Sequence, residues 1–273
     1  MSIGDVSLSS SARQNLLSLQ STSKLLGQTQ ARLASGKKVN SSLDNASAYF
    51  ASKGFINTAN DFANLKDNIS TAVQTIKSAT DAIDSIQAVV NQMQGLTNSA
   101  LQTKDLTTLS GLASQYNGLR GQIDGIVSDS VFNGTNLLDS TTNQLSVFFN
   151  ATNTTSLVID AVNNTSAGLG IAAASGSWAA QADILGAQSI LQTALSTLRT
   201  NSSSFGNNNT ILQTRLEFTT NLVSTLQTAS DNLVLADTNE EGANMQALQA
   251  QSQLGIVALG ISGEQAKAIM RLF

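Results

Sequence analysis

Cysteine, histidine and proline are all absent from this chain of 273 residues. Without cysteine, no disulfide, thiolate metal site or cysteine nucleophile can form. Without histidine, Ser-His-Asp triads, most zinc sites and the commonest general base are excluded. The composition therefore predicts a protein that is not an enzyme and that uses no metal or cofactor.

The lack of proline also bears on the fold, because no position is barred from a helix interior by a proline ring. Aromatic residues make up only 4% of the chain, which argues against a compact core built on large rings. The net charge is −4 and the 14 basic residues are scattered, so no basic stripe is offered to nucleic acid. We therefore expect helices that pack through small and aliphatic side chains, and no nucleic-acid partner.

Neither end of the sequence reads as a membrane signal. The N-terminal stretch MSIGDVSLSSSARQNLLSLQ has no uninterrupted apolar segment and no cleavage box, so it is not a Sec signal peptide. The closing stretch LGIVALGISGEQAKAIMRLF is long enough to span a bilayer as a helix. However, Glu264, Lys267 and Arg271 would be buried unpaired in lipid, which argues against stable membrane insertion.

The apolar residues of the closing stretch recur at three-to-four spacing, which predicts an amphipathic helix. A comparable leucine stripe lies near the N-terminus. Both stripes require a protein partner or a membrane surface to cover them.

Long heptad patterns occupy most of the chain. Between Phe55 and Met93 the apolar residues keep an unbroken heptad register, which predicts one long helix with a coiled-coil seam. A polar turn near Thr103–Thr108 leads to a second helix, which should pack antiparallel on the first. A third seam runs from Ile184 to Leu233, with a helix break or kink expected at Gly206–Asn209. The seam residues of this predicted rod are Phe62, Ile69, Ile76, Ile83, Val90, Leu191, Leu198, Leu212, Leu226 and Leu233.

Helical periodicity stops in the middle of the chain. The dipeptide Asn133-Gly134 is typical of a tight turn. The segments QLSVFF and SLVIDAV flank the polar NATNTT and predict a β-hairpin, followed by a loop at about 162–176. The predicted fold class is therefore mainly α: an elongated antiparallel helical bundle with one small β-hairpin element.

Three segments resemble the bacterial flagellins. ARLASGKKVNSSLDNASAYFAS (31–52) is similar to their N-terminal signature, and VFNGTNLL (131–138) is similar to the turn that closes their N-terminal helical half. Residues 232–273 are similar to their C-terminal signature. Because the three motifs occur in the family's order, the chain is identified as a member of this family with a minimal central variable domain.

The resemblance implies a structural subunit that self-assembles into the flagellar filament used for swimming motility. Residues 1–40 and 237–273 would form helices that pair in the inner tube of the filament. Residues 41–140 and 181–236 would form the two halves of the rod, and residues 141–180 a short β-rich surface region. The inner-tube contacts would involve Leu8, Leu16, Leu19, Leu26, Leu33, Leu254, Val257, Ile261, Ile269, Leu272 and Phe273.

The resemblance also implies export through the flagellar type III apparatus, and a location outside the cell. An export chaperone and the cap and hook-associated proteins would be further partners. Two alternatives stay open: a hook-filament junction protein, and a secreted coiled-coil protein that acts on membranes. Glu240 and Glu241 are interpreted as helix-start residues that complement the helix dipole.

Recognition by the Toll-like flagellin receptor is a further expectation from the resemblance. Strongly sensed flagellins carry an arginine-rich patch on the first long helix. The matching stretch VVNQMQGLTN has no charged residue, and Met93, Gln94 and Gly95 stand near the expected anchors. Arginine anchors with bidentate geometry are not replaced by such residues. The chain is therefore expected to be recognised weakly or not at all.

Overall fold

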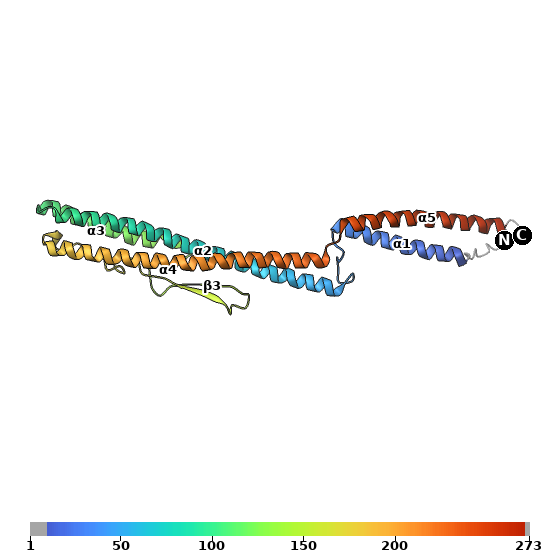
Figure 1. Cartoon of the computed structure of the whole chain (residues 1–273), viewed down its shortest axis with the longest axis horizontal. Helices are drawn as coiled ribbons and strands as arrows, with labels where there is room; N and C mark the ends of the chain where they lie inside the picture. The colour runs from blue at the N-terminus through green and yellow to red at the C-terminus, as the bar shows by residue number, and fades with distance from the viewer. Residues whose placement is uncertain (1–9, 271–273) are drawn as a thin grey trace. The chain divides into compact units, whose positions relative to one another are not determined.

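The computed structural model describes residues 10–270, apart from the side chains of Ala266, Ile269 and Met270. This part of the chain is mainly helical, with two short antiparallel strand pairs (Figure 1). The predicted fold class, mainly α with a small β element, is confirmed. The elements are α1 (Ser10–Ser35), α2 (Ala46–Leu101), α3 (Leu106–Asp129), β1 (Val131–Phe132), β2 (Thr135–Asn136), β3 (Gln144–Phe148), β4 (Ser156–Asp160), the 3-10 turn η1 (Ser175–Trp178), α4 (Gln181–Val234) and α5 (Thr238–Met270).

The chain divides into two compact units. The terminal unit comprises residues 1–58 and 225–273, and the central unit comprises residues 59–224. Both boundaries fall inside long helices, because α2 and α4 each contribute residues to both units. The five-segment division drawn from the sequence, with limits at residues 40 and 236, remains a prediction.

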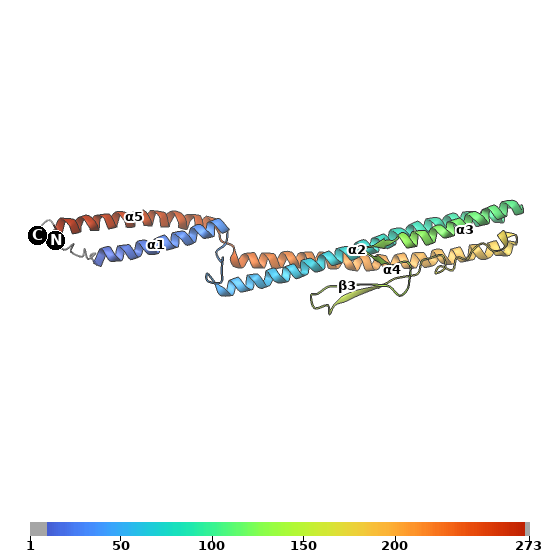
Figure 2. The ribbon, with the colours of Figure 1, turned by 180° about the vertical axis from the view of Figure 1, so that it is seen from behind.

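The core of the central unit lies between α2, α3 and α4, which run side by side in both views (Figures 1 and 2). Ile69, Ile83 and Val90 of α2 are fully buried, as are Leu191 and Leu198 of α4. The heptad spacing explains this burial, since it keeps one apolar stripe of each helix turned toward its neighbours. The other predicted seam residues divide into two groups: Ile76 and Leu212 are buried, whereas Phe62, Leu226 and Leu233 are half-buried.

The polar connection between α2 and α3 fixes the start of α3. Asp105 is the N-cap, and its carboxylate accepts hydrogen bonds from the backbone N–H and the hydroxyl of Thr108. Both bonds lower the pKa of Asp105, and the bond from the hydroxyl has the larger effect. The cap satisfies a backbone donor that the first turn of a helix leaves without a partner.

Side chains of α3 hold the loop that leads to α4. Ser166 donates to the carboxylate of Asp124 through its backbone N–H (2.7 Å) and its hydroxyl (2.8 Å). Farther along, Trp178 is only 1% exposed and packs edge-on against Tyr116, with ring centroids 5.0 Å apart. Burial raises the pKa of Tyr116. The loop is thus part of the core of the central unit.

Helix α4 runs without a break from Gln181 to Val234, so the helix break expected at Gly206–Asn209 was wrong. A glycine costs a helix interior only about 1 kcal/mol relative to alanine. Phe205 and Leu212 are buried on either side of this segment, and their packing outweighs that cost.

Two hairpins lie between α3 and the loop. The β1–β2 turn consists of Asn133 and Gly134, whose φ angles are both positive (48° and 78°). Positive φ at both positions is required for a two-residue turn that follows the twist of its strands. The predicted hairpin is present as β3 and β4, with Ser146 opposite Val158. The guanidinium of Arg215 lies 5.0 Å from the ring centroid of Phe149, and this contact joins the hairpin to α4.

We predict that Ile83→Ala lowers the free energy of unfolding of the monomer by about 2–5 kcal/mol, because burial is lost and a cavity remains. Ile211, which is exposed on α4, provides the matched control. Ile211→Ala should change stability by about 0.5 kcal/mol or less. Chemical denaturation followed by circular dichroism measures both, and equal losses would show that the seam is not the core.

Candidate assembly interface

The terminal unit is built on the antiparallel pair of α1 and α5 (Figure 1). Arg32, near the end of α1, meets Glu241, near the start of α5, with a distance of 2.9 Å between Nη1 and Oε1. Earlier in α1, Leu19 contacts α5 at Gly255. The terminal helices therefore pair with each other, and their place in the inner tube of the filament remains a prediction.

Each helix of this pair turns toward the other a face whose residues recur at spacings of three and four positions. On α1 the buried and half-buried residues of this face include Ala12, Asn15, Leu19, Thr22, Leu26, Thr29 and Leu33. On α5 they include Glu241, Met245, Leu248, Ser252, Gly255, Leu259 and Ser262. Many of these side chains are small or polar, so the pair buries little apolar area for its length.

At Gly255 a side chain of α1 lies close to the backbone of α5. A methyl group at this position would stand 3.2 Å from Cδ1 of Leu19, which is tighter than an ordinary carbon–carbon contact. Glycine therefore allows a leucine of α1 to lie directly against the backbone of α5.

The ion pair between Arg32 and Glu241 is unevenly buried. The side chain of Glu241 is 10% exposed, whereas that of Arg32 is 39% exposed. The second carboxylate oxygen of Glu241 has no hydrogen-bond partner among the described residues. Glu241 does lie in the first turn of α5, as the sequence indicated, and it additionally fixes the register against α1.

The segments that connect the terminal helices to α2 and α4 are joined to each other by backbone hydrogen bonds. The N–H of Lys38 donates to the carbonyl of Val234 (2.7 Å), and the N–H of Ala236 donates to the carbonyl of Gly36 (3.0 Å). In the first connection, backbone N–H groups of Ser41 and Asn40 donate to Asp44 and lower its pKa.

A second apolar face of α5 points away from α1. Leu254, Val257 and Ile261 are 70%, 59% and 56% exposed, and we call these three residues the α5 stripe. On α1, Leu17 and Leu25 are exposed in the same way. An exposed apolar stripe of this kind is a candidate surface for contact with another molecule.

The sequence grouped the terminal apolar residues into one interface, and the structure places them on different faces. Leu16, Leu19, Leu26 and Leu33 are half-buried, and Leu19 contacts α5. The α5 stripe is exposed. Leu8, Leu272 and Phe273 lie outside the described residues, and so does the side chain of Ile269.

The inward face of α5 was missed by sequence reasoning. Met245, Leu248 and Leu259 follow the same periodicity as the α5 stripe, displaced around the helix. This second periodic set of apolar residues was the sequence signal that could have identified the inward face of α5. The partnership of Arg32 with Glu241 has no local sequence signal, because 209 positions separate the two residues.

Among the described residues, no three histidine, cysteine, aspartate or glutamate side chains gather as metal ligands would. Within the same residues, no helix combines the length and the hydropathy that crossing a bilayer requires. The surface of the terminal unit that stands out chemically is its apolar stripe.

Comparison with known proteins identifies the family. Residues 6–143 match the model of the bacterial flagellin N-terminal helical region. The whole chain also aligns with the whole of flagellin FljM from Caulobacter vibrioides at 32% identity. The chain belongs to the flagellin family.

The chain is also similar to other flagellins. Flagellin FljO from the same organism is 31% identical over the full length of both chains. Flagellin C of Rhizobium meliloti is 33% identical over 85 residues, 31% of this chain and 26% of that protein. The crystal structure of Bacillus cereus flagellin covers 56% of this chain and 88% of its own, at 21% identity and a TM-score of 0.49.

This flagellin is a structural subunit of the flagellar filament, the extracellular part of the flagellum, and it assembles with copies of itself. Full-length alignment with curated flagellins shows that it is a short member of the family. The exposed stripe on α5 must therefore be considered in a polymer, where other copies are present.

We predict that Glu241→Gln loosens the pairing of α1 with α5 by about 1 kcal/mol, because the partly exposed Arg32 loses its anionic partner. Amide hydrogen exchange in α1 should become about fivefold faster in the monomer. Glu240→Gln removes an exposed charge from the same turn and should leave exchange unchanged. The same acceleration in both variants would assign the effect to the helix dipole instead.

Proposed function

We propose that this flagellin contacts the next copies in its filament through the α5 stripe, Leu254, Val257 and Ile261. The proposal rests on one observation: the three side chains are more than half exposed on a helix whose other face already contacts α1. A subunit that exists in a polymer can cover this face, whereas its own α1 cannot.

The physical basis is the non-closing contact between identical copies. When one face of a subunit binds a different face of the next, and the rotation does not close a ring, an open helical filament results. Burying each side chain of the α5 stripe contributes roughly 1.5–3 kcal/mol. That contribution adds to the packing within the α1–α5 pair, where many of the facing side chains are small or polar.

Several finer features of the role belong to the same proposal. The chain would leave the cell unfolded through the flagellar type III apparatus, and the complete lack of cysteine supports passage without a disulfide. An export chaperone and the cap and hook-associated proteins would be its partners on that route. The protein would have no catalytic activity, since histidine and cysteine are missing from the sequence.

We predict that the combined change Leu254→Asn, Val257→Asn and Ile261→Asn raises the critical concentration for filament growth at least tenfold. Tenfold corresponds to about 1.4 kcal/mol, less than the burial of one such side chain. Seeded growth on filament fragments, followed by light scattering and electron microscopy, measures the effect. Helicity of the monomer should be retained, because these residues are exposed in it.

The matched control replaces three exposed polar residues of α5, as Gln246→Asn, Gln249→Asn and Gln253→Asn. It carries a similar loss of helix propensity without any loss of apolar surface. The control should change the critical concentration less than twofold. Normal filaments from the stripe variant would contradict the proposed contact, and binding of lipid vesicles by the unaltered monomer would favour a membrane-active role.

We propose that the Toll-like flagellin receptor recognises this protein weakly, because residues 93–95 of α2 supply no anchoring side chain. Met93 is fully buried in the core of the central unit, so its side chain offers nothing to a receptor. Gln94 is half-buried and Gly95 is exposed without a side chain. These positions therefore lack the bidentate cation that anchors a desolvated interface.

We predict that the monomer activates reporter cells carrying this receptor at least tenfold less potently than a strongly sensed flagellin does. Loss of one anchoring arginine commonly costs about 2 kcal/mol or more at an interface. Dose–response curves for both monomers measure the difference. Equal potency would show that recognition uses residues outside this patch.

A further inference from the structure

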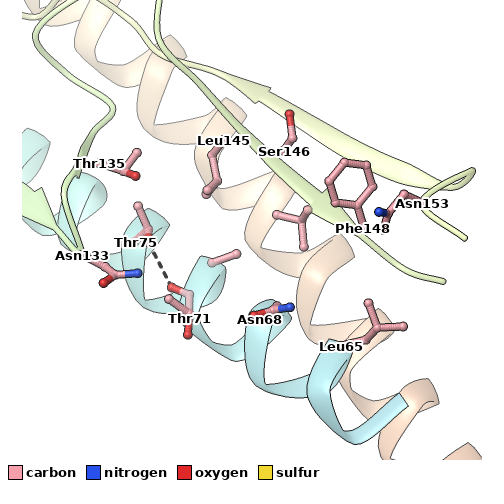
Figure 3. A pocket seen from close by; sticks show the side chains of 12 residues that line it. Leu65, Asn68, Thr71, Thr75, Asn133, Thr135, Leu145, Ser146, Phe148 and Asn153 are labelled. Atoms are coloured by element: carbon pink, nitrogen blue, oxygen red, sulfur yellow. Dashed lines mark hydrogen bonds between the residues drawn. The ribbon is translucent and has the colours of Figure 1, made fainter. Parts of the chain in front are cut away.

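A groove of about 240 Å³ separates β3 from α2 in the central unit (Figure 3). Asn133 and Thr135 lie at one end, whereas Phe148 and Asn153 lie at the other (Figure 3). Its twelve lining residues include no charged side chain. The proposed contact through α5 makes no use of this groove.

Among the described residues, β4 is the strand paired with β3, so the edge of β3 that borders the groove is open. In this hairpin the N–H of Phe149 donates to the carbonyl of Thr155, and the N–H of Ala161 donates to the carbonyl of Asn143. Antiparallel strands alternate, so the odd-numbered residues of β3 bond to β4. The N–H and C=O groups of Ser146, an even-numbered residue, therefore point away from β4 and toward the open edge.

The groove lies on the β3 side of the hairpin. Its lining includes Leu145, Ser146, Val147 and Phe148 of β3 and no residue of β4. β3 contains neither lysine nor proline, two of the devices that proteins use to protect an edge strand from other chains. The main-chain groups of Ser146 therefore form an unprotected edge beside an uncharged hollow.

The floor and the opposite wall of the groove complement an added strand. Leu65, Ala72 and Val147 are buried and form an apolar floor. Asn68 stands on α2 across from β3 (Figure 3). Its side-chain amide makes no hydrogen bond to the described residues, so a donor and an acceptor are available to the far side of a bound chain.

Pairing with β4 and a contact with α4 hold β3 in an extended conformation, which lowers the entropy cost of binding. The five residues of β3 are paired with β4 over their whole length. Contact of Arg215 with Phe149 then joins the hairpin to α4.

We propose that this groove binds an extended, uncharged segment of a partner polypeptide, which adds as a strand to the edge of β3. Main-chain hydrogen bonds to Ser146 supply the affinity, as in other complexes formed by strand addition. Side chains of the bound segment alternate between the floor and the solvent, so every second residue is a small aliphatic one. Charged residues are disfavoured at the floor because no counter-charge lines the groove.

A capped Thr-Val-Thr-Val-Thr peptide is the probe, titrated into the full-length monomer labelled with ¹⁵N. The amide resonances of Ser146 and Phe148 should shift, and the Ser146 amide should gain protection from hydrogen exchange. A capped Thr-Lys-Thr-Lys-Thr peptide, which replaces the two floor-facing valines by charged residues, should bind at least fivefold more weakly. Absence of any shift at β3 would overturn the proposal.

Ser146→Pro tests the edge itself, since proline removes an outward N–H without removing a bond to β4. It should weaken peptide binding at least fivefold, the loss expected for one hydrogen bond and a blocked edge. Ser156→Pro is the matched control, because Ser156 is an even-numbered partner position on the opposite edge of the hairpin. Equal weakening by both variants would overturn the proposal.

Two further measurements keep the test decisive. Asn68→Ala alters the opposite wall without touching the hairpin, and it should weaken binding about threefold whether or not Ser146→Pro folds. Cellobiose, a neutral saccharide, is titrated in parallel. Shifts of the β3 amides by cellobiose but not by the peptide would overturn strand addition and identify a sugar-binding groove.

Discussion

The terminal helices of this flagellin carry more apolar surface than they can cover by pairing with each other. Their shared seam alternates leucine with alanine, threonine, serine and glycine, as Leu19 against Gly255 illustrates. The α5 stripe remains outside that seam. Because the hydrophobic effect favours covering such a surface, the free subunit is incomplete, and contact with further copies is the direct way to complete it.

The central unit satisfies its apolar surface internally. Ile69, Ile83 and Val90 are fully buried against α3 and α4, and Trp178 closes the packing at the loop. Such a core supports folding before any assembly, whereas the helix pair of the terminal unit depends on thin packing and one partly exposed ion pair. The same chain therefore combines a self-sufficient unit with one whose surface is suited to a polymer.

The backbone N–H and C=O groups differ between the two proposed contact surfaces, the α5 stripe and the edge of β3. On α5 the backbone is satisfied within the helix, so any contact there is made by side chains and depends on apolar area. At β3 the backbone of Ser146 is open, so a contact there is made by main-chain hydrogen bonds and depends on an extended partner. These two chemistries select different kinds of molecule.

Periodicity in the sequence was sufficient to predict the helical fold and the β3–β4 hairpin, but it grouped the apolar residues of the terminal helices into one interface and missed the inward face of α5. It was insufficient at Gly206, where local propensity suggested a break and the burial of Phe205 and Leu212 maintained the helix. Spacing along a helix tells which residues share a face, because the helical repeat is fixed. Which face meets which partner was decided by tertiary contacts: α1 packs on the side of α5 that carries Gly255 and Glu241, because glycine permits close approach and Arg32 supplies the opposite charge.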